Sequence, residues 1–297
     1  MQIVPTGKVL GATVTGVDLT QPLSKADFAT LLRALGQHGV LRFPKQRLTA
    51  AQLRDMARNF GPLQTGIAAQ ASEPDVPEVS VLSNIVVDGK AIGIPDAGQS
   101  WHTDMTYNQI PGYVNTLCAW EVPVRDGRIL GATEFCDCAR AYDDLPEDIK
   151  QLIADKTAVH DLNLYWEYMR REKGSTRAPL TPEQAALRRV VHPVVRVHPV
   201  SGRKVLFVNP GYCDAVDGLP RAVGEALMKR LLDHVLQPQY RYVHEWQRDD
   251  VLIWDNLWTW HNARADYRPD EPRHMKRCQV LAHDILNPEW VRTALAA

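Results

Sequence analysis

Short apolar runs interleaved with polar residues dominate the second half of the chain. They are rich in β-branched and aromatic residues, and turn residues bound them. This pattern is typical of strands that bury one face. We expect strands at 113–122, 128–137, 194–200, 204–209, 240–246 and 250–256.

The first sixty residues predict two strands and two helices. Residues 7–20 alternate apolar and small polar residues, and residues 40–44 form a short apolar run that Pro44 ends. Apolar residues at helical spacing follow Ser24 and Thr49, two residue types that cap helices. Two more helices are expected at 143–154 and 220–236, between the later strands.

No repeat, low-complexity tract or clear linker divides the sequence. We therefore expect a single domain, 1–297, that is mainly β with flanking helices (α+β). Its expected core is a double-stranded β-helix, or jelly roll.

The segment 64–100 differs from the rest because it is rich in Gly, Pro, Ala, Asp and Ser. It contains one strand-like run, 78–87, followed by Asp88-Gly89, a strong hairpin signal. Long loops in compact domains often act as lids or binding loops. We expect an active-site loop or lid here, and a disordered loop without function is the alternative.

Composition excludes several classes of protein. The formal net charge of −1 gives no basic field for nucleic acid or an anionic membrane. No apolar run approaches the ~20 residues that span a bilayer. Met1 to Lys8 lacks a signal-peptide pattern. The five cysteines, an odd number, are interpreted as reduced thiols of a cytoplasmic protein.

Candidate chemistry begins with His102 and Asp104, two residues apart in SWHTDMTY. On a strand both side chains would project from one face. With a third ligand from a distant strand they would form the facial triad of non-haem Fe(II) oxygenases, which leaves three metal positions open. The pair alone is weak evidence, because a satisfied surface or core pair accounts for it equally well.

His261 is the candidate third ligand, since it follows the buried run VLIWDN and closes an aromatic segment. Downstream, a strand over 274–282 would place Arg273, Met275, Arg277 and Gln279 on one face. An arginine inside a β-sandwich is costly unless it meets an anion, and its planar fork matches a carboxylate. The alternative is an exposed strand face on which these arginines pair with Asp or Glu.

Together these segments resemble the taurine dioxygenase family of Fe(II)/2-oxoglutarate enzymes, which includes the aryloxyalkanoate (2,4-D) dioxygenases. The resemblance covers nearly the whole chain. It runs through VLGATVTGVDL, VLRFPKQRLT, ARNFGPL, WHTDMTY, ATEFCD, AYDDLP, SGRKVLFVN and LIWDN to the segment from His261 to Arg277.

The resemblance implies specific roles. His102, Asp104 and His261 would ligate Fe(II). Thr133 and Arg273 would hold the distal carboxylate of 2-oxoglutarate, and Arg277 would meet either this cosubstrate or an anionic substrate. With O2, such an enzyme hydroxylates its substrate and releases succinate and CO2; a hydroxyl placed beside a heteroatom leads to cleavage of the bond to that heteroatom.

Asp104 argues against the halogenase branch, in which a small residue replaces the carboxylate. Candidate substrate contacts are Gln99, Tyr107 and Asn209, for which packing or turn hydrogen bonds are the alternative. The family often forms homodimers or homotetramers. No nucleic-acid or membrane partner is expected.

Two departures from the family pattern affect these expectations. Leu130 to Thr133 replaces the usual Gly-Gly-Asp-Thr, although the Thr133 hydroxyl remains. No histidine follows Gly61-Pro62-Leu63, where taurine enzymes grip the sulfonate, so taurine is disfavoured and another small anionic organic substrate is expected. Two rivals stay open: a Zn-dependent hydrolase on the same triad, and a non-catalytic metal-binding β-sandwich protein.

Overall fold

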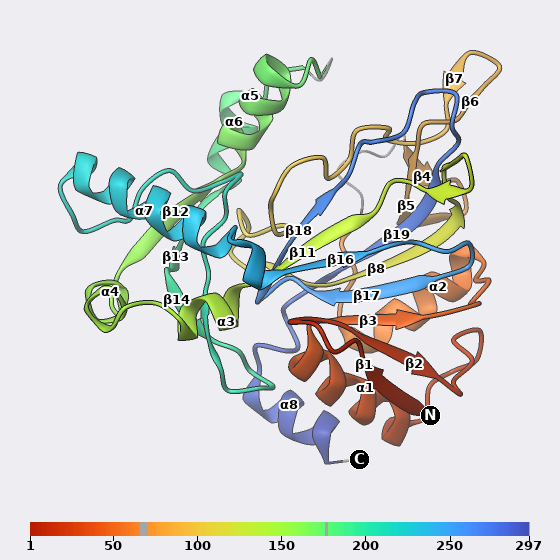
Figure 1. Cartoon of the computed structure of the whole chain (residues 1–297), viewed down its shortest axis with the longest axis horizontal. Helices are drawn as coiled ribbons and strands as arrows, with labels where there is room; N and C mark the ends of the chain where they lie inside the picture. The colour runs from red at the N-terminus through yellow and green to blue at the C-terminus, as the bar shows by residue number, and fades with distance from the viewer. Residues whose placement is uncertain (66–70, 176–177, 297) are drawn as a thin grey trace.

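An eight-stranded sheet carries most of the core of the computed structural model, which describes residues 1–65, 71–175 and 178–296 (Figure 1). Its order is β1-β2-β3-β17-β8-β19-β5-β4, and its neighbouring strands are antiparallel except β2 and β3. The strands are β1 (Gln2–Pro5), β2 (Ala12–Thr15), β3 (Val40–Phe43), β4 (Ser72–Glu73), β5 (Val76–Ser83), β8 (Gly112–Glu121), β17 (Val251–Asp255) and β19 (His274–Leu281).

A three-stranded sheet, β16-β11-β18, packs one face toward this large sheet. It consists of β16 (Arg241–His244), β11 (Thr133–Asp137) and β18 (Thr259–Ala263). Successive side chains of a strand point to opposite faces. Phe135 of β11 contacts Trp254 of β17 with ring centroids 5.6 Å apart, whereas Cys136 packs in a second apolar cluster on the far side. The space between the two sheets is where the candidate site lies.

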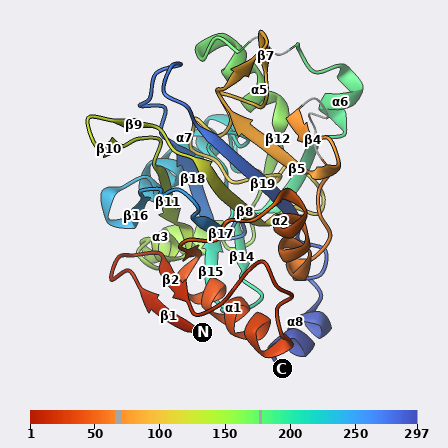
Figure 2. The same cartoon turned by 90° about the vertical axis from the view of Figure 1, so that its right-hand side faces the viewer.

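Helices cover the outer faces of both sheets (Figures 1 and 2). Among the described residues they are α1 (Lys25–His38), α2 (Ala50–Ala57), α3 (Cys138–Asp143), α4 (Glu147–Ile153), α5 (Leu162–Glu172), α6 (Pro182–Ala186), α7 (Arg221–Val235) and α8 (Pro288–Leu295). Ser24 caps α1 and Thr49 caps α2, as the sequence predicts. Helix α7 confirms the helix expected at 220–236.

Helices α5 and α6 lie at the opposite end of the molecule from the two termini (Figures 1 and 2). They follow β12 (Thr157–Asp161) and precede its antiparallel partner β13 (Arg189–Pro193). We call residues 162–188 the α5–α6 excursion. Its first turn reaches the candidate site.

The remaining small sheets are hairpins. The β6–β7 turn has φ of 50° at Asp88 and 74° at Gly89, the left-handed pair that a two-residue hairpin of this kind requires. The hairpin prediction is thus confirmed. The strands are β6 (Val86–Val87), β7 (Lys90–Ala91), β9 (Val124–Arg125), β10 (Arg128–Ile129), β14 (Val195–Val197) and β15 (Lys204–Leu206). Short 3₁₀ helices span Arg58–Phe60 and Pro238–Tyr240.

Several expected elements are wrong in extent. The expected strand at 128–137 is divided into β10 and β11, and the expected strand at 78–87 is divided into β5 and β6. Within the range 7–20 only Ala12–Thr15 forms a strand, β2. Its partner β1 lies before this range, and the loop between them has positive φ at Gly7 and Gly11. The helix at 143–154 is broken between α3 and α4, where Pro146 disfavours helical geometry at the residue before it.

The described chain is therefore a mixed structure of helices and a large, mainly antiparallel sheet. No described helix is long and apolar enough to cross a membrane. The expected lid at 64–100 contains β4 to β7, and its residues 66–70 lie outside the described residues.

Candidate metal centre

A pair of backbone hydrogen bonds joins the two histidines of the candidate centre. The N–H of His102 donates to the carbonyl of His261 at 3.0 Å, and the N–H of His261 donates to the carbonyl of His102 at 2.7 Å. Their ring centroids are consequently 4.2 Å apart. Segments distant in sequence are thus fixed opposite one another by the backbone alone.

The ring of His102 is oriented for metal binding by its other nitrogen. Nδ1 lies 2.7 Å from the carbonyl oxygen of Ser100, which can only accept, so Nδ1 carries the proton. Nε2 is left with its lone pair, 3.4 Å from Oδ1 of Asp104. A metal-binding imidazole is commonly held in this way.

His261 is buried on β18, beside His102 and the Trp254 ring. Burial, followed by the nearby His102, lowers the pKa of His261 well below its usual value. The imidazole is therefore neutral at neutral pH, which is the form that binds metal. Its Nε2 lies 3.8 Å from Oδ2 of Asp104.

Asp104 is ionised despite being buried. Burial alone would raise its pKa, but Arg277, His102 and His261 outweigh that effect and hold the pKa well below the usual value. Its Oδ2 accepts hydrogen bonds from Asn115 at 2.5 Å, Gln279 at 2.8 Å and, more weakly, Arg277 at 3.4 Å. Potential ligand atoms of His102, Asp104 and His261 all lie within 4.8 Å of one another.

The local structure differs from the expected strand. His102 makes one isolated bridge and Asp104 begins a turn, since Met105 adopts a left-handed φ of 58°. The side chain of Asn209 supports this turn by donating to the Thr103 carbonyl at 2.7 Å and to Thr106 Oγ1 at 3.1 Å. Hydrogen bonds within the protein, including Gly211 N–H to Oδ1 at 3.0 Å, use both ends of the Asn209 amide.

Arg273 is a buried guanidinium without a carboxylate partner in the described part of the chain. Only 5% of the residue is exposed, and burial lowers its pKa. Its Nε has no hydrogen-bond partner there, and its neighbours are Gly131 and the ring of Tyr267, whose centroid is 5.9 Å away. Such a group needs an anion to offset its desolvation.

Thr133, two residues beyond Gly131, offers a second polar group at this end of the site. Its Oγ1 accepts a hydrogen bond from Nε1 of Trp246 at 3.0 Å. The hydroxyl proton of Thr133 therefore remains available to donate. A buried fork and a hydroxyl of this kind suit a carboxylate.

A cavity of about 280 Å³ opens from His102 and Asp104 toward α5. Arg277 and Gln279 enter it from β19, and residues 94, 97 and 98 contribute from the expected lid segment. The lining residues are Ser80, Ile94, Ala97, Gly98, His102, Asp104, Tyr107, Leu162, Tyr165, Trp166, Tyr212, Arg277 and Gln279.

Tyr107 and Tyr212 form the aromatic floor of this cavity, edge to face with ring centroids 5.1 Å apart. Burial raises the pKa of both phenols, so they stay neutral and can donate. Two phenol donors are therefore available to a bound molecule.

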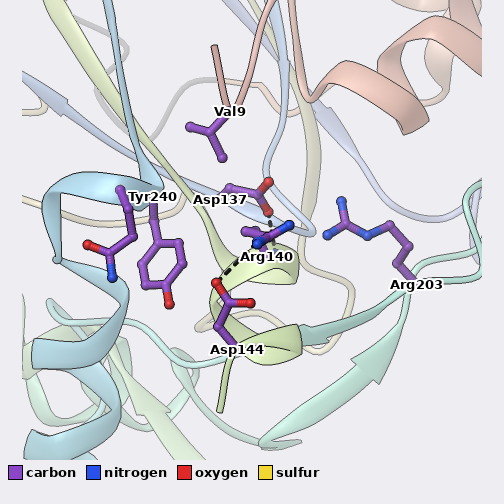
Figure 3. A pocket seen from close by; sticks show the side chains of 7 residues that line it. Val9, Asp137, Arg140, Asp144, Arg203 and Tyr240 are labelled. Carbon is purple, nitrogen blue, oxygen red and sulfur yellow. Dashed lines mark hydrogen bonds and ion pairs between the residues drawn. The ribbon is translucent and has the colours of Figure 1, made fainter.

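Another hollow, of about 370 Å³, lies at α3 (Figure 3). Its charges are already paired: Arg140 with Asp144 at 3.1 Å, and Arg203 with Asp143 at 2.9 Å. Asp137 caps α3, and burial raises its pKa to about 6. Nothing there resembles the convergent, unpaired groups of the metal centre.

The sequence and fold of this chain have counterparts among known proteins. Residues 2–279 match the family described as taurine catabolism dioxygenase TauD, TfdA family. The chain belongs to this family. As a TauD/TfdA dioxygenase it is an oxidoreductase of the 2-oxoglutarate-dependent class, which confirms the resemblance seen in the sequence.

Relatives of this TauD/TfdA protein extend over nearly its whole length. The alpha-ketoglutarate-dependent 2,4-dichlorophenoxyacetate dioxygenase of Burkholderia sp. (strain RASC) is 33% identical, over 94% of this chain and 95% of its own. Pentalenolactone F synthase of Streptomyces avermitilis is 30% identical, over 95% and 94%.

Solved structures of the TauD/TfdA type superpose closely. AAD-2 in complex with Mn(II) and N-oxalylglycine gives a TM-score of 0.78 at 29% identity, covering 94% of this chain and 98% of that one. A taurine dioxygenase from Burkholderia xenovorans gives 0.76 at 27%, covering 94% and 89%.

The structure separates the candidate residues of this TauD/TfdA chain. Tyr107 lines the cavity, whereas Gln99 lines an open surface depression near Lys173. Sequence reasoning missed Asn115, whose contact with Asp104 depends on strand register, and α5. The helix had a signal: Asp161 caps it, and apolar residues follow at helical spacing.

Proposed function

We propose that this protein is an Fe(II)- and 2-oxoglutarate-dependent dioxygenase that hydroxylates a small anionic organic substrate and releases succinate and CO2. His102, Asp104 and His261 would hold the iron, which supplies oxidising power from O2 when bound. Two imidazoles and one carboxylate form the donor set that such iron prefers. A metal ion held by these residues would face the cavity that His102 and Asp104 line.

The observation that carries the cosubstrate assignment is the buried guanidinium of Arg273, which has no carboxylate partner in the described residues. We assign Arg273 and Thr133 to the distal carboxylate of 2-oxoglutarate, with Arg277 close to the same region. A hydrolase using Zn2+ on this triad would need neither group. N-oxalylglycine, present in the AAD-2 structure, is a dicarboxylate as well, which supports the same class of ligand.

The cavity supports a small substrate, because its volume is below that of most drug-sized ligand sites. Arg277, with 16% of its side chain exposed, would meet an anionic group, and Tyr107 and Tyr212 would donate to a second polar atom. Aromatic rings on either side favour an apolar body between these two groups. The relative named for 2,4-dichlorophenoxyacetate supports testing aryloxyalkanoates first, with bond cleavage beside the ether oxygen as one outcome.

Gln99 and Asn209 have weaker support as substrate contacts than Tyr107 has. Gln99 would need to enter from the lid segment 64–100. Asn209 is fully buried and already hydrogen-bonded, so we assign it to holding the metal-binding turn. Taurine stays disfavoured, because Gln64 and Thr65 stand where a sulfonate-gripping histidine is expected.

We further propose that residues 1–297 form one dioxygenase domain whose two facing sheets are a jelly roll, and that 64–100 acts as its lid. The five buried, unpaired cysteines support a cytoplasmic protein. A homodimer or homotetramer remains an expectation from the family.

Succinate release tests the function directly. Purified protein is incubated with Fe(II), ascorbate and 2-oxoglutarate across aryloxyalkanoates, sulfonates, sulfate esters and amino-acid derivatives. We expect succinate with at least one class, lost on chelation of the metal and restored by Fe(II) rather than Zn2+. Hydrolysis supported by Zn2+ without succinate would favour the hydrolase.

A binding experiment separates the non-catalytic rival. Under anaerobic conditions, adding 2-oxoglutarate to the Fe(II) protein should give a weak visible charge-transfer band. If iron binds and no band appears, the protein is better explained as a non-catalytic metal-binding protein.

A further inference from the structure

Two side-chain amides meet on one oxygen of Asp104. Asn115 on β8 and Gln279 on β19 are direct cross-strand partners. Their amide nitrogens lie 2.5 Å and 2.8 Å from Oδ2 of Asp104. Neighbouring side chains on one face of an antiparallel pair lie close enough to act together. We call Asn115 and Gln279 the amide pair.

The pair fixes which way the carboxylate faces. An ionised carboxylate offers about two acceptor sites on each oxygen. The two amides fill those of Oδ2, and Arg277 adds a third, longer contact of 3.4 Å. Oδ1 receives no amide and is the oxygen nearest His102, 3.4 Å from Nε2.

We propose that Asn115 and Gln279 are positioning residues that hold Asp104 as a one-oxygen metal ligand through Oδ1. Binding through both oxygens would use a coordination position that 2-oxoglutarate or O2 needs. This inference rests on the metal centre of the proposed function and adds the residues that orient it.

One feature of Asn115 indicates a role in the site and not in the stability of the core. It is fully buried, and its Oδ1 has no hydrogen-bond partner in the described structure. Such an orphaned buried acceptor costs roughly 1–3 kcal/mol. The opposite amide orientation would direct this oxygen at the Asp104 carboxylate, so repulsion between the oxygens excludes it. An apolar residue of the same size would avoid this cost, but it would take one donor away from Oδ2 of Asp104.

The amide pair also affects Arg277. Because neutral donors already satisfy Oδ2, Arg277 is left with one long contact to Asp104 and an unpaired Nε beside the cavity. Its charge remains available to a bound anion. Without the amides, we expect Arg277 to move onto Asp104.

Metal binding tests the inference without requiring a known substrate. Mn(II) affinity is measured by calorimetry for the wild type, Asn115→Leu and Gln279→Met, both substitutions of similar size. Loss of partners that orient a ligand typically weakens metal binding 10–100-fold. We expect each variant to lose roughly that factor.

The matched control is the next cross-strand pair, Thr116 and Cys278, on the same two strands. Thr116→Val also removes a buried polar group, but Thr116 makes no contact with Asp104. We expect unchanged Mn(II) affinity. Urea unfolding without metal completes the comparison: all three variants should remain folded at the temperature of the calorimetry, so that a lower Mn(II) affinity reports the lost contact with Asp104.

The outcomes are distinct. If the wild type binds Mn(II), Asp104→Ala does not, and both amide variants bind like the wild type, the inference is overturned and the metal centre stands. If the wild type itself fails to bind Mn(II), the proposed function and this inference fall together. Gln279 is partly exposed to the cavity, so Gln279→Met keeps the test decisive if Asn115→Leu does not fold.

Discussion

Arg273 should oppose stability until 2-oxoglutarate binds. Its guanidinium is buried, with no carboxylate partner in the described residues, so the neighbouring Tyr267 offsets only part of its desolvation. Arg273→Met keeps much of the side-chain length and removes the charge. We expect Arg273→Met to stabilise the ligand-free protein by roughly 1–3 kcal/mol, the range for relieving a buried unsatisfied polar group.

The same substitution should nearly abolish cosubstrate binding. Removing one partner of a buried, hydrogen-bonded charge pair costs roughly 2–5 kcal/mol. At 1.4 kcal/mol per factor of ten, the Kd for 2-oxoglutarate should rise roughly 30- to 4000-fold. The two effects have opposite signs, which a general packing defect would not produce.

Thermal and urea unfolding of the Mn(II)-loaded protein, with and without 2-oxoglutarate, measures both effects. At one hundred times Kd a ligand stabilises the native state by about 2.7 kcal/mol. The variant should therefore be the more stable without 2-oxoglutarate, and should gain little from adding it. The difference in unfolding free energy between Arg273→Met and the wild type should shrink or change sign when 2-oxoglutarate is present.

Arg264→Met is the matched control, because Arg264 is an exposed arginine paired with Glu134 at 2.6 Å. Arg264→Met should change neither the unfolding free energy of the ligand-free protein nor the binding free energy of 2-oxoglutarate by more than about 1 kcal/mol. Arg273→Lys retains the charge without the planar fork and should fall between the wild type and Arg273→Met in affinity. The reasoning is refuted if Arg273→Met destabilises the ligand-free protein, or if 2-oxoglutarate stabilises it as much as the wild type.

Three further predictions address separate parts of the molecule. Asp104→Ala should abolish Fe(II)-dependent succinate formation, and turnover retained by this variant would contradict the ligand assignment. Tyr107→Phe and Tyr212→Phe should each raise the substrate KM roughly 2- to 12-fold, the equivalent of one hydrogen bond, without changing the KM for 2-oxoglutarate. If the two KM values rise equally, the phenols do not recognise the substrate. Burial lowers the pKa of His160 in the folded protein to about 3. As pH falls below 6.5, the unfolded chain therefore takes up a proton at His160 that the folded protein does not. The free energy of unfolding should fall by up to about 1.4 kcal/mol per pH unit between pH 6.5 and pH 3. His160→Phe should flatten that slope in urea unfolding, whereas a substitution of the exposed His283 should not.

Local patterns predicted the elements that depend on local chemistry. The caps at Ser24 and Thr49, the hairpin at Asp88-Gly89 and the helix at 220–236 each follow from a few neighbouring residues. His102 and Asp104 were found through their spacing, although they lie in a turn and not on a strand. Residue type and order, together with the resemblance, mattered more there than the local element.

Contacts between distant segments could not be derived in the same way. The amide pair depends on the register of β19 against β8, and a shift of one residue would point Gln279 away from Asp104. The sequence alone was compatible with either an exposed or a buried Arg273. The structure shows that this side chain packs against Gly131 and is buried. The sequence contained signals for helix α5, but it contained none for the position of this helix over the cavity.

The α5–α6 excursion contributes part of the cavity wall from outside the two facing sheets. The residues proposed to hold the metal and the cosubstrate lie on or beside the two facing sheets, whereas Leu162, Tyr165 and Trp166 of the cavity wall belong to an excursion between β12 and β13. Relatives about equally similar to this chain carry names that refer to quite different molecules. A chimera that exchanges only residues 162–188 would therefore transfer much of the substrate-facing wall while leaving the oxidising centre unchanged.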